Sequence, residues 1–153
     1  MKRFLFLFVF LVFAISCNKD DDKFKEKDII ISNLNFTDCV KSNESINSST
    51  SCLTIKSDGN NNLTFTHKGA EFCCETEDIE ISFAVNGDSL IIQEIDNGPF
   101  SYCFCEHDIS FNIGPLDFGY YKVKLIESEN SYNRDTLIFE FNHTSNTNYS
   151  NCN

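Results

Sequence analysis

The sequence predicts an all-β fold, an antiparallel β-sandwich of about seven short strands. Apolar and polar residues alternate with a period of two along most of the chain, and turn-forming residues separate these stretches at short intervals. No stretch of comparable length carries the 3.6-residue apolar stripe of a helix. Because the apolar face of an antiparallel sheet must be covered, so many short strands favour two packed sheets over one open sheet.

The first two predicted strands form a hairpin. Apolar residues alternate in 53–55 and again in 63–67, where Phe65 and His67 share a face, and the turn-rich segment 57–62 separates the two stretches. The next two strands, expected at 79–85 and 90–95, form a second hairpin. Between them lie Asn86 and Gly87, residues that favour the positive φ of a two-residue turn. Three further alternating stretches complete the set, at 109–113, 121–125 and 137–141.

A short motif before the 121–125 stretch sharpens the fold class. Leu116, Gly119, Tyr121 and Val123 have the L-x-x-G-x-Y-x-V spacing of a tyrosine corner, and this segment resembles the corner of immunoglobulin-like and fibronectin-type domains. The resemblance implies an Ig-like sandwich, in which the Tyr121 hydroxyl bonds to the backbone and is structural rather than catalytic. A small barrel or another Greek-key arrangement is the alternative.

The first 16 residues have the layout of a secretory signal. Two cations, Lys2 and Arg3, precede an apolar run from Phe4 to Ile15 that would rise only about 18 Å as a helix, against about 30 Å of bilayer hydrocarbon. The segment 14–17 that follows resembles the lipobox of bacterial lipoproteins, although Ala14 replaces the usual leucine. The resemblance implies cleavage before Cys17 and lipid on that cysteine. An ordinary signal peptide with a fortuitous cysteine is the alternative.

The residues after Cys17 predict the organisation of the mature chain. The segment 18–22, Asn-Lys-Asp-Asp-Asp, resembles the acidic export tag of Bacteroidetes surface lipoproteins, and its alternative reading is a solvated tether. We expect a signal at 1–16, a lipidated tether at 17–28, a sandwich at 29–144 and a disordered tail at 145–153, with an Asn- and Ser-rich loop at 41–51. The predicted location is the outer membrane, surface-exposed, with its periplasmic face as the alternative.

The charge of the mature chain limits its partners. Loss of Lys2 and Arg3 leaves 10 basic residues against 23 acidic ones, a formal net charge of −13. Such a surface repels phosphate backbones and carries no basic patch, so nucleic acid is not an expected partner. The expected contacts are a membrane, through lipid on Cys17, and an envelope protein or glycan.

Three segments between residues 63 and 125 carry a wider resemblance. They are Phe72-Cys73-Cys74, the C-x-C-x-x-D segment from Cys103 to Asp108, and the tyrosine corner from Gly119 to Val123. In this order they resemble a group of small, functionally uncharacterised, cysteine-rich Bacteroidetes surface lipoproteins. The resemblance covers less than half of the chain and implies a fold and a compartment, without an activity.

Seven cysteines remain after Cys17. At this density, outside the cytoplasm, they indicate disulfides. Adjacent residues of a strand point to opposite faces, so both members of the Cys73/Cys74 pair cannot bridge both members of the Cys103/Cys105 pair across flat strands. We therefore expect one bridge between these pairs, a local bridge that joins the cysteines at 39 and 52, and an unpaired cysteine near the C-terminus. The disulfide candidates are Cys39, Cys52, Cys73, Cys74, Cys103 and Cys105, and the unpaired residue is Cys152.

A metal site is the alternative use of the same residues. Cys103, Cys105 and His107 lie on one strand face, and Cys73 or Cys74 is a possible fourth ligand, a set that zinc or copper(I) accepts. The C-x-C-x-H spacing differs from the turn-forming C-x-x-C of tetrahedral sites, and thiols in an oxidising compartment tend to pair. Structural disulfides are therefore preferred, and we expect no cofactor.

No motif of an enzyme is present: there is no G-x-S-x-G, no phosphate-binding glycine loop and no H-E-x-x-H. The three histidines are scattered and are expected at the surface or at strand edges. Ser89 and Thr136 lie in D-S/T-aliphatic tripeptides that resemble Bacteroidetes O-glycosylation acceptors. The sequence thus predicts a binding or structural module rather than an enzyme. Exposed aromatic residues, with candidates at 102, 118 and 120, would support binding; convergence of His107 and Asp108 in a pocket would support an enzyme.

Overall fold

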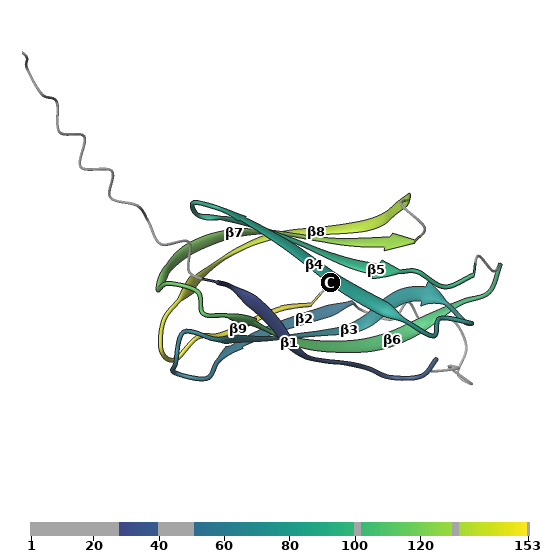
Figure 1. The fold of residues 1–153 in the computed structure, drawn as a ribbon, viewed down its shortest axis with the longest axis horizontal. Coiled ribbons are helices and arrows are strands. Elements are labelled where there is room, and N and C mark those ends of the chain that lie inside the picture. The colour runs from purple at the N-terminus through teal and green to yellow at the C-terminus, as the bar shows by residue number, and fades with distance from the viewer. Residues whose placement is uncertain (1–27, 40–50, 100–101, 130–131, 153) are drawn as a thin grey trace, which may run out of the picture.

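The computed structural model describes residues 28–39, 51–99, 102–129 and 132–152. Nine strands form two layers (Figure 1). The predicted signal at 1–16, most of the tether at 17–28 and most of the loop at 41–51 lie outside the described residues. The strands are β1 (Ile30–Phe36), β2 (Cys52–Ser57), β3 (Leu63–Cys73), β4 (Ile79–Asn86), β5 (Ser89–Asp96), β6 (Phe104–Gly114), β7 (Gly119–Glu129), β8 (Tyr132–His143) and β9 (Asn148–Cys152).

The two layers are a five-stranded sheet in the order β1-β6-β3-β2-β9 and a four-stranded sheet in the order β4-β5-β7-β8. They pack face to face as a β-sandwich, which confirms the predicted fold class (Figure 1). Among the described strands, only β5 and β7 pair in parallel. The chain leaves the four-stranded sheet after β5, forms β6 in the other sheet, and returns in its original direction as β7 beside β5.

Both predicted hairpins are present. Strands β2 and β3 pair antiparallel from Cys52 opposite Lys68 to Ser57 opposite Leu63. In the second hairpin, β4 pairs with β5, and Asn86 lies opposite Ser89. Its turn therefore consists of residues 87 and 88, one position later than the predicted pair 86 and 87, because Asn86 is still paired in β4. Gly87 has a φ of +61°, a conformation that glycine adopts without steric cost.

All seven predicted strands are present, and the structure adds β1 and β9 at the two edges of the five-stranded sheet. Most side chains of β1 are exposed, and its pairing with β6 shifts register between Ser32 and Asn35. The sequence of β1 therefore shows no alternation from which the strand could be predicted. Strand β9 lies in the segment 145–153, where the prediction of a disordered tail is wrong. This segment is ordered by pairing with β2, from Asn148 opposite Lys56 to Cys152 opposite Cys52, which composition does not indicate.

The core lies between the sheets. It is formed by alternate residues of both layers, and stacked Phe65 and Phe111 lie at its centre on the five-stranded side. The segment before β7 forms the hydrogen bond of a tyrosine corner: the Tyr121 hydroxyl donates to the carbonyl oxygen of Asp117 at 2.9 Å, and Leu116 is buried in the core. Tyr121 thus has a structural role at the start of β7.

Candidate functional site

Six cysteines of the described residues form three disulfides, Cys39–Cys105, Cys52–Cys152 and Cys74–Cys103. The last is the predicted bridge between the two cysteine pairs. It joins the end of β3 to the start of β6, where the Cys74 amide also donates to the Cys103 carbonyl at 2.9 Å.

The predicted local bridge between Cys39 and Cys52 is wrong, and so is the prediction that Cys152 is unpaired. Cys39 follows β1, which lies beside β6, whereas Cys52 begins β2, which lies two strands beyond β6 and next to β9. Each cysteine therefore pairs with the neighbour that the sheet order supplies, and not with the one that is close in sequence.

Among the cysteines that the structure describes, the free one is Cys73, which was predicted as a disulfide candidate. Cys73 and Cys74 are adjacent at the end of β3 and point to opposite sides. The Cys73 side chain is buried and its Sγ lies 3.5 Å from the Pro99 carbonyl oxygen, while Cys74 is partly exposed and bridged. The buried Cys73 thiol therefore lies against a backbone carbonyl and not against another of the described cysteines.

The thiolate metal site, the alternative to disulfides, is not compatible with the cysteine pairing of this structure. Cys74, Cys103 and Cys105 are all in disulfides, so these sulfurs are not available as thiolate ligands. His107 does lie beside Cys105, with its Nε2 3.3 Å from the Cys105 sulfur, and its Nδ1–H donates to the carbonyl oxygen of Thr37 at 2.8 Å. Its ring also packs edge-on against Phe36 and Phe72.

His107 and Asp108 do not converge. The His107 side chain is buried on the inner face, and the next residue, Asp108, accepts a hydrogen bond from the backbone amide of Gly69 at 3.3 Å. Gly69 lies in the register shift of β3, between His67 and Ala70, and has a φ of +71°. Asp108 therefore supports this irregularity in β3, a structural role.

A different polar cluster lies inside the sandwich, where five ionisable residues are almost completely buried. His67 comes from β3, and the four carboxylates come from the ends of β5 and β7. The parallel register of these two strands places Glu94 beside Glu127 and Asp96 beside Glu129. Because β3 belongs to the opposite sheet, the imidazole and the carboxylates meet between the layers. The five residues, which we call the buried polar cluster, are His67, Glu94, Asp96, Glu127 and Glu129.

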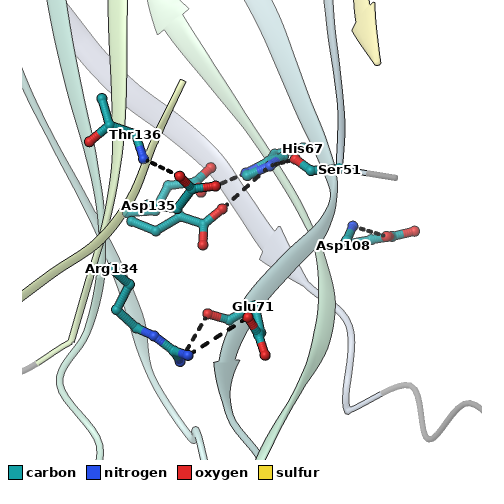
Figure 2. Close-up of polar contacts among 10 residues, drawn as sticks. Ser51, His67, Glu71, Asp108, Arg134, Asp135 and Thr136 are labelled. Atoms are coloured by element: carbon teal, nitrogen blue, oxygen red, sulfur yellow. Dashed lines mark hydrogen bonds and ion pairs between the residues drawn. The ribbon is translucent and has the colours of Figure 1, made fainter. Parts of the chain in front are cut away.

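Each ring nitrogen of His67 has a partner. Nδ1 lies 2.8 Å from Glu94 Oε2, and Nε2 lies 2.8 Å from the Ser51 hydroxyl. A second carboxylate, Glu127, places its Oε1 3.6 Å from Nε2. Figure 2 shows the His67 ring with Ser51 beside it, and Arg134 directed at Glu71 nearby. A ligand atom of each of His67, Glu94 and Glu127 lies within 4.8 Å of the others, so these three residues are able to hold a metal ion.

The two outer carboxylates of the cluster have their own partners, although Glu129 Oε1 has no hydrogen-bond partner among the described residues. Glu129 Oε2 lies 3.5 Å from the guanidinium of Arg134, and Asp96 accepts hydrogen bonds from the Thr76 hydroxyl and, at 2.8 Å, from the backbone amide of Gly98. Glu94 and Glu127 share the imidazole of His67, and Glu127 also has a hydrogen bond with the backbone of Glu71.

The electrostatics of this inner group follow from its burial. Burial, together with the nearby carboxylates of Glu94 and Asp135, raises the pKa of Glu127 to about 7, although the charge of His67 and a hydrogen bond from the Glu71 backbone oppose the rise. Burial alone would lower the pKa of His67, but the charge and hydrogen bond of Glu94, together with Glu127 and Asp135, outweigh it and raise the pKa. The group therefore favours binding positive charge, whether a proton or a cation.

All three histidines are buried, so the expectation that they lie at the surface or at strand edges is wrong. The third, His143 at the end of β8, contacts the rings of Phe118 and Tyr121 and lies 3.4 Å from the Thr147 hydroxyl.

The sequence did contain a signal for the buried polar cluster. His67 continues the inward alternation of Leu63 and Phe65 in β3. In the same way, Glu94 and Asp96 continue the inward phase of β5, and 127 and 129 continue that of β7. Ionisable residues in the apolar phase of three different strands indicate a polar interior, provided that the strands face one another.

The exposed aromatic residues do not form one patch. Tyr102 precedes β6, whereas Phe118 and Tyr120 follow it, and an 11-residue strand separates the two positions by roughly 33 Å. All three side chains are exposed. Tyr120 lies on the outer face of the four-stranded sheet, where its hydroxyl contacts the Glu140 carboxylate.

None of the described residues forms a helix long and apolar enough to cross a membrane. Compared with protein-family models, curated proteins and solved structures, the chain matches none of them.

Proposed function

We propose that this chain is a lipid-anchored cell-envelope protein whose β-sandwich serves as a binding or structural module. The observation that carries the proposal is the presence of three disulfides within one sandwich, because disulfides at this density are typical of proteins that fold in an oxidising compartment. The signal-like segment 1–16, the lipobox-like segment before Cys17 and the acidic segment 18–22 support export and anchoring at the outer membrane, facing outward.

The outer face of the four-stranded sheet is our candidate contact surface for an envelope protein or glycan. Strand register places Ile91, Lys124 and Ile138 in one row across β5, β7 and β8. Ile138 is 74% exposed, and Tyr120 lies further along the same face of β7. A mixed apolar, aromatic and basic surface on an otherwise acidic protein is suited to a partner that buries apolar area and carries acidic or hydroxyl groups.

The anchoring is tested on the full-length chain in its native membrane. We expect metabolic labelling with a fatty-acid probe to modify the wild type and not the Cys17→Ala variant, and we expect the N-terminal peptide of the mature protein to begin at a diacylated cysteine. External protease should degrade the wild type in intact cells. An unlabelled protein whose mature chain begins elsewhere would contradict the anchor.

The contact surface is tested by a photo-crosslinking residue at position 138. A discrete cross-linked species should form from this position and should be absent from position 56, an exposed site on β2 in the other sheet. Equal cross-linking from both positions, or none from position 138, would argue against this face as the binding surface.

A further inference from the structure

The inner part of the buried polar cluster has an imbalance of charge. Glu94 and Glu127 face one imidazole, that of His67, and all three side chains are 0–6% exposed. Even a protonated His67 leaves one negative charge in excess when both carboxylates are ionised. Asp96 and Glu129 do not relieve the excess, because they are negative themselves and their own partners, Thr76, Gly98 and Arg134, are already engaged. Buried charges are normally paired or coordinated to metal ions.

A second observation points to a ligand. The Oε1 atom of Glu94 has no hydrogen-bond partner in the part of the chain that the structure describes, although the residue is fully buried. Its other oxygen, Oε2, is the one that contacts His67. A buried carboxylate oxygen without a partner is costly, and a bound cation would satisfy it.

The spacing of the group fits a small ion. Zinc binds imidazole nitrogen and carboxylate oxygen at about 2.1 Å, so two ligand atoms on one ion lie roughly 3 to 3.5 Å apart. The ring nitrogen Nε2 of His67 lies 3.6 Å from Glu127 Oε1, and one ligand atom of each of the three residues lies within 4.8 Å of the others. The other ring nitrogen, Nδ1, contacts Glu94 Oε2 at 2.8 Å; this contact would orient the ring, as a carboxylate commonly does for metal-bound histidine, and it leaves Glu94 Oε1 free to bind the ion.

We propose that His67, Glu94 and Glu127 form a binding site for one divalent transition-metal cation, held between the two sheets. The three residues come from β3, β5 and β7, so the ion would connect strands of both layers. One nitrogen and carboxylate oxygens suit zinc or manganese, whereas calcium prefers six to eight oxygen ligands. The inference concerns a site that the proposed envelope function does not use, and it stands or falls independently of it.

The test uses the mature full-length protein, purified in detergent after export through an oxidising compartment and stripped of metal with a chelator that is then removed. Zn²⁺, Mn²⁺ and Ca²⁺ are titrated separately, with stoichiometry from native mass spectrometry, affinity from calorimetry and the melting temperature from thermal unfolding. We expect one Zn²⁺ or one Mn²⁺ per chain, with a higher melting temperature in its presence, because a ligand that binds only the folded state stabilises it.

Two isosteric variants keep the test meaningful if one of them does not fold. Glu94→Gln and Glu127→Gln each remove a charge without a change of shape, and each should weaken binding at least 100-fold and abolish the metal-dependent rise in melting temperature. The matched control is Glu80→Gln on the outward face of β4, in the same sheet. Glu80 is exposed and accepts a hydrogen bond from Asn97 that glutamine can also accept, so this variant should bind metal like the wild type.

The proposal is overturned if neither Zn²⁺ nor Mn²⁺ binds at one per chain, if Ca²⁺ alone does, or if the two cluster variants bind as the control does. It is likewise overturned if Glu127→Gln stabilises the protein and the wild type shows no metal-dependent stabilisation, since the occupant of the cluster would then be a proton.

Discussion

At the scale of single residues, the placement of His67 explains how charge is tolerated inside this sandwich. Its imidazole contacts Glu94 through Nδ1 and Ser51 through Nε2, and a Glu127 oxygen lies 3.6 Å from Nε2. An isolated carboxylate in such a position would lose several kcal/mol of hydration, and partial neutralisation by the imidazole offsets this cost. Burial raises the pKa of Glu127, so its protonation state should control the stability of the metal-free protein.

We predict that the metal-free protein loses stability between pH 5 and pH 8. The pKa of Glu127 is 4.5 without burial and about 7 in the folded protein. Between these values the folded state retains a proton that the unfolded chain releases, so a rise in pH removes stability, in total about 3 kcal/mol. His67, whose folded pKa is also raised, acts in the same direction, because its stabilising charge is lost as pH rises through that pKa.

Urea unfolding at both pH values, with chelator present, measures this effect. Glu127→Gln should be the more stable protein at pH 8 and should show a smaller loss between the two values, although His67, Glu94 and Asp135 still face the site. If the wild type and the variant depend on pH in the same way, Glu127 does not carry the raised pKa.

At the scale of elements, β9 shows how a polar segment becomes a strand. It is an edge strand that pairs with β2 alone. Its inward residue Tyr149 stacks on Phe139 of the other sheet, with 5.4 Å between the ring centroids. The Cys52–Cys152 disulfide joins the two strands where they lie directly opposite. Backbone pairing, one aromatic contact and one cross-link thus supply the order that the composition of 145–153 does not predict.

We predict that this disulfide contributes more stability than Cys74–Cys103. The two bridges connect residues 100 and 29 positions apart, and the chain-entropy model gives about 5 and about 3.5 kcal/mol for loops of these lengths. The paired substitutions Cys52→Ser/Cys152→Ser and Cys74→Ser/Cys103→Ser are to be compared by urea unfolding. The Cys52→Ser/Cys152→Ser variant should lose more free energy of unfolding than the other variant. The decrease should be larger still if β9 detaches from β2. A larger loss for the second pair would refute this ranking.

At the scale of the whole molecule, the cross-links are distributed unevenly. All three disulfides join strands, or strand ends, of the five-stranded sheet, and none of those in the described residues joins the two layers. The four-stranded sheet is therefore held to its partner by the apolar core and by the buried polar cluster. A metal ion in that cluster would add a further connection between the layers.

We predict three disulfides and one free thiol in the mature protein. Cys17 carries lipid in this reading, six cysteines are bridged, and Cys73 remains. Because Cys73 is completely buried, a maleimide should modify it only after denaturation, whereas reduction before labelling should expose seven thiols. Intact mass spectrometry checks both counts. Rapid labelling of the native protein, or two or more free thiols, would contradict this pairing.

The sequence by itself determined the strands that alternate, the two hairpins and the tyrosine corner at Tyr121. Alternation, turn chemistry and a hydrogen bond between residues four positions apart are all local properties of the chain. Only the tertiary structure decided that β1 lies beside β6 and β9 beside β2, and hence which cysteines pair. It also decided that His67 meets Glu94 and Glu127. Each of these residues follows the inward phase of its own strand, but their encounter depends on contacts between strands that are distant in sequence, and alternation within one strand carries no information about its neighbours.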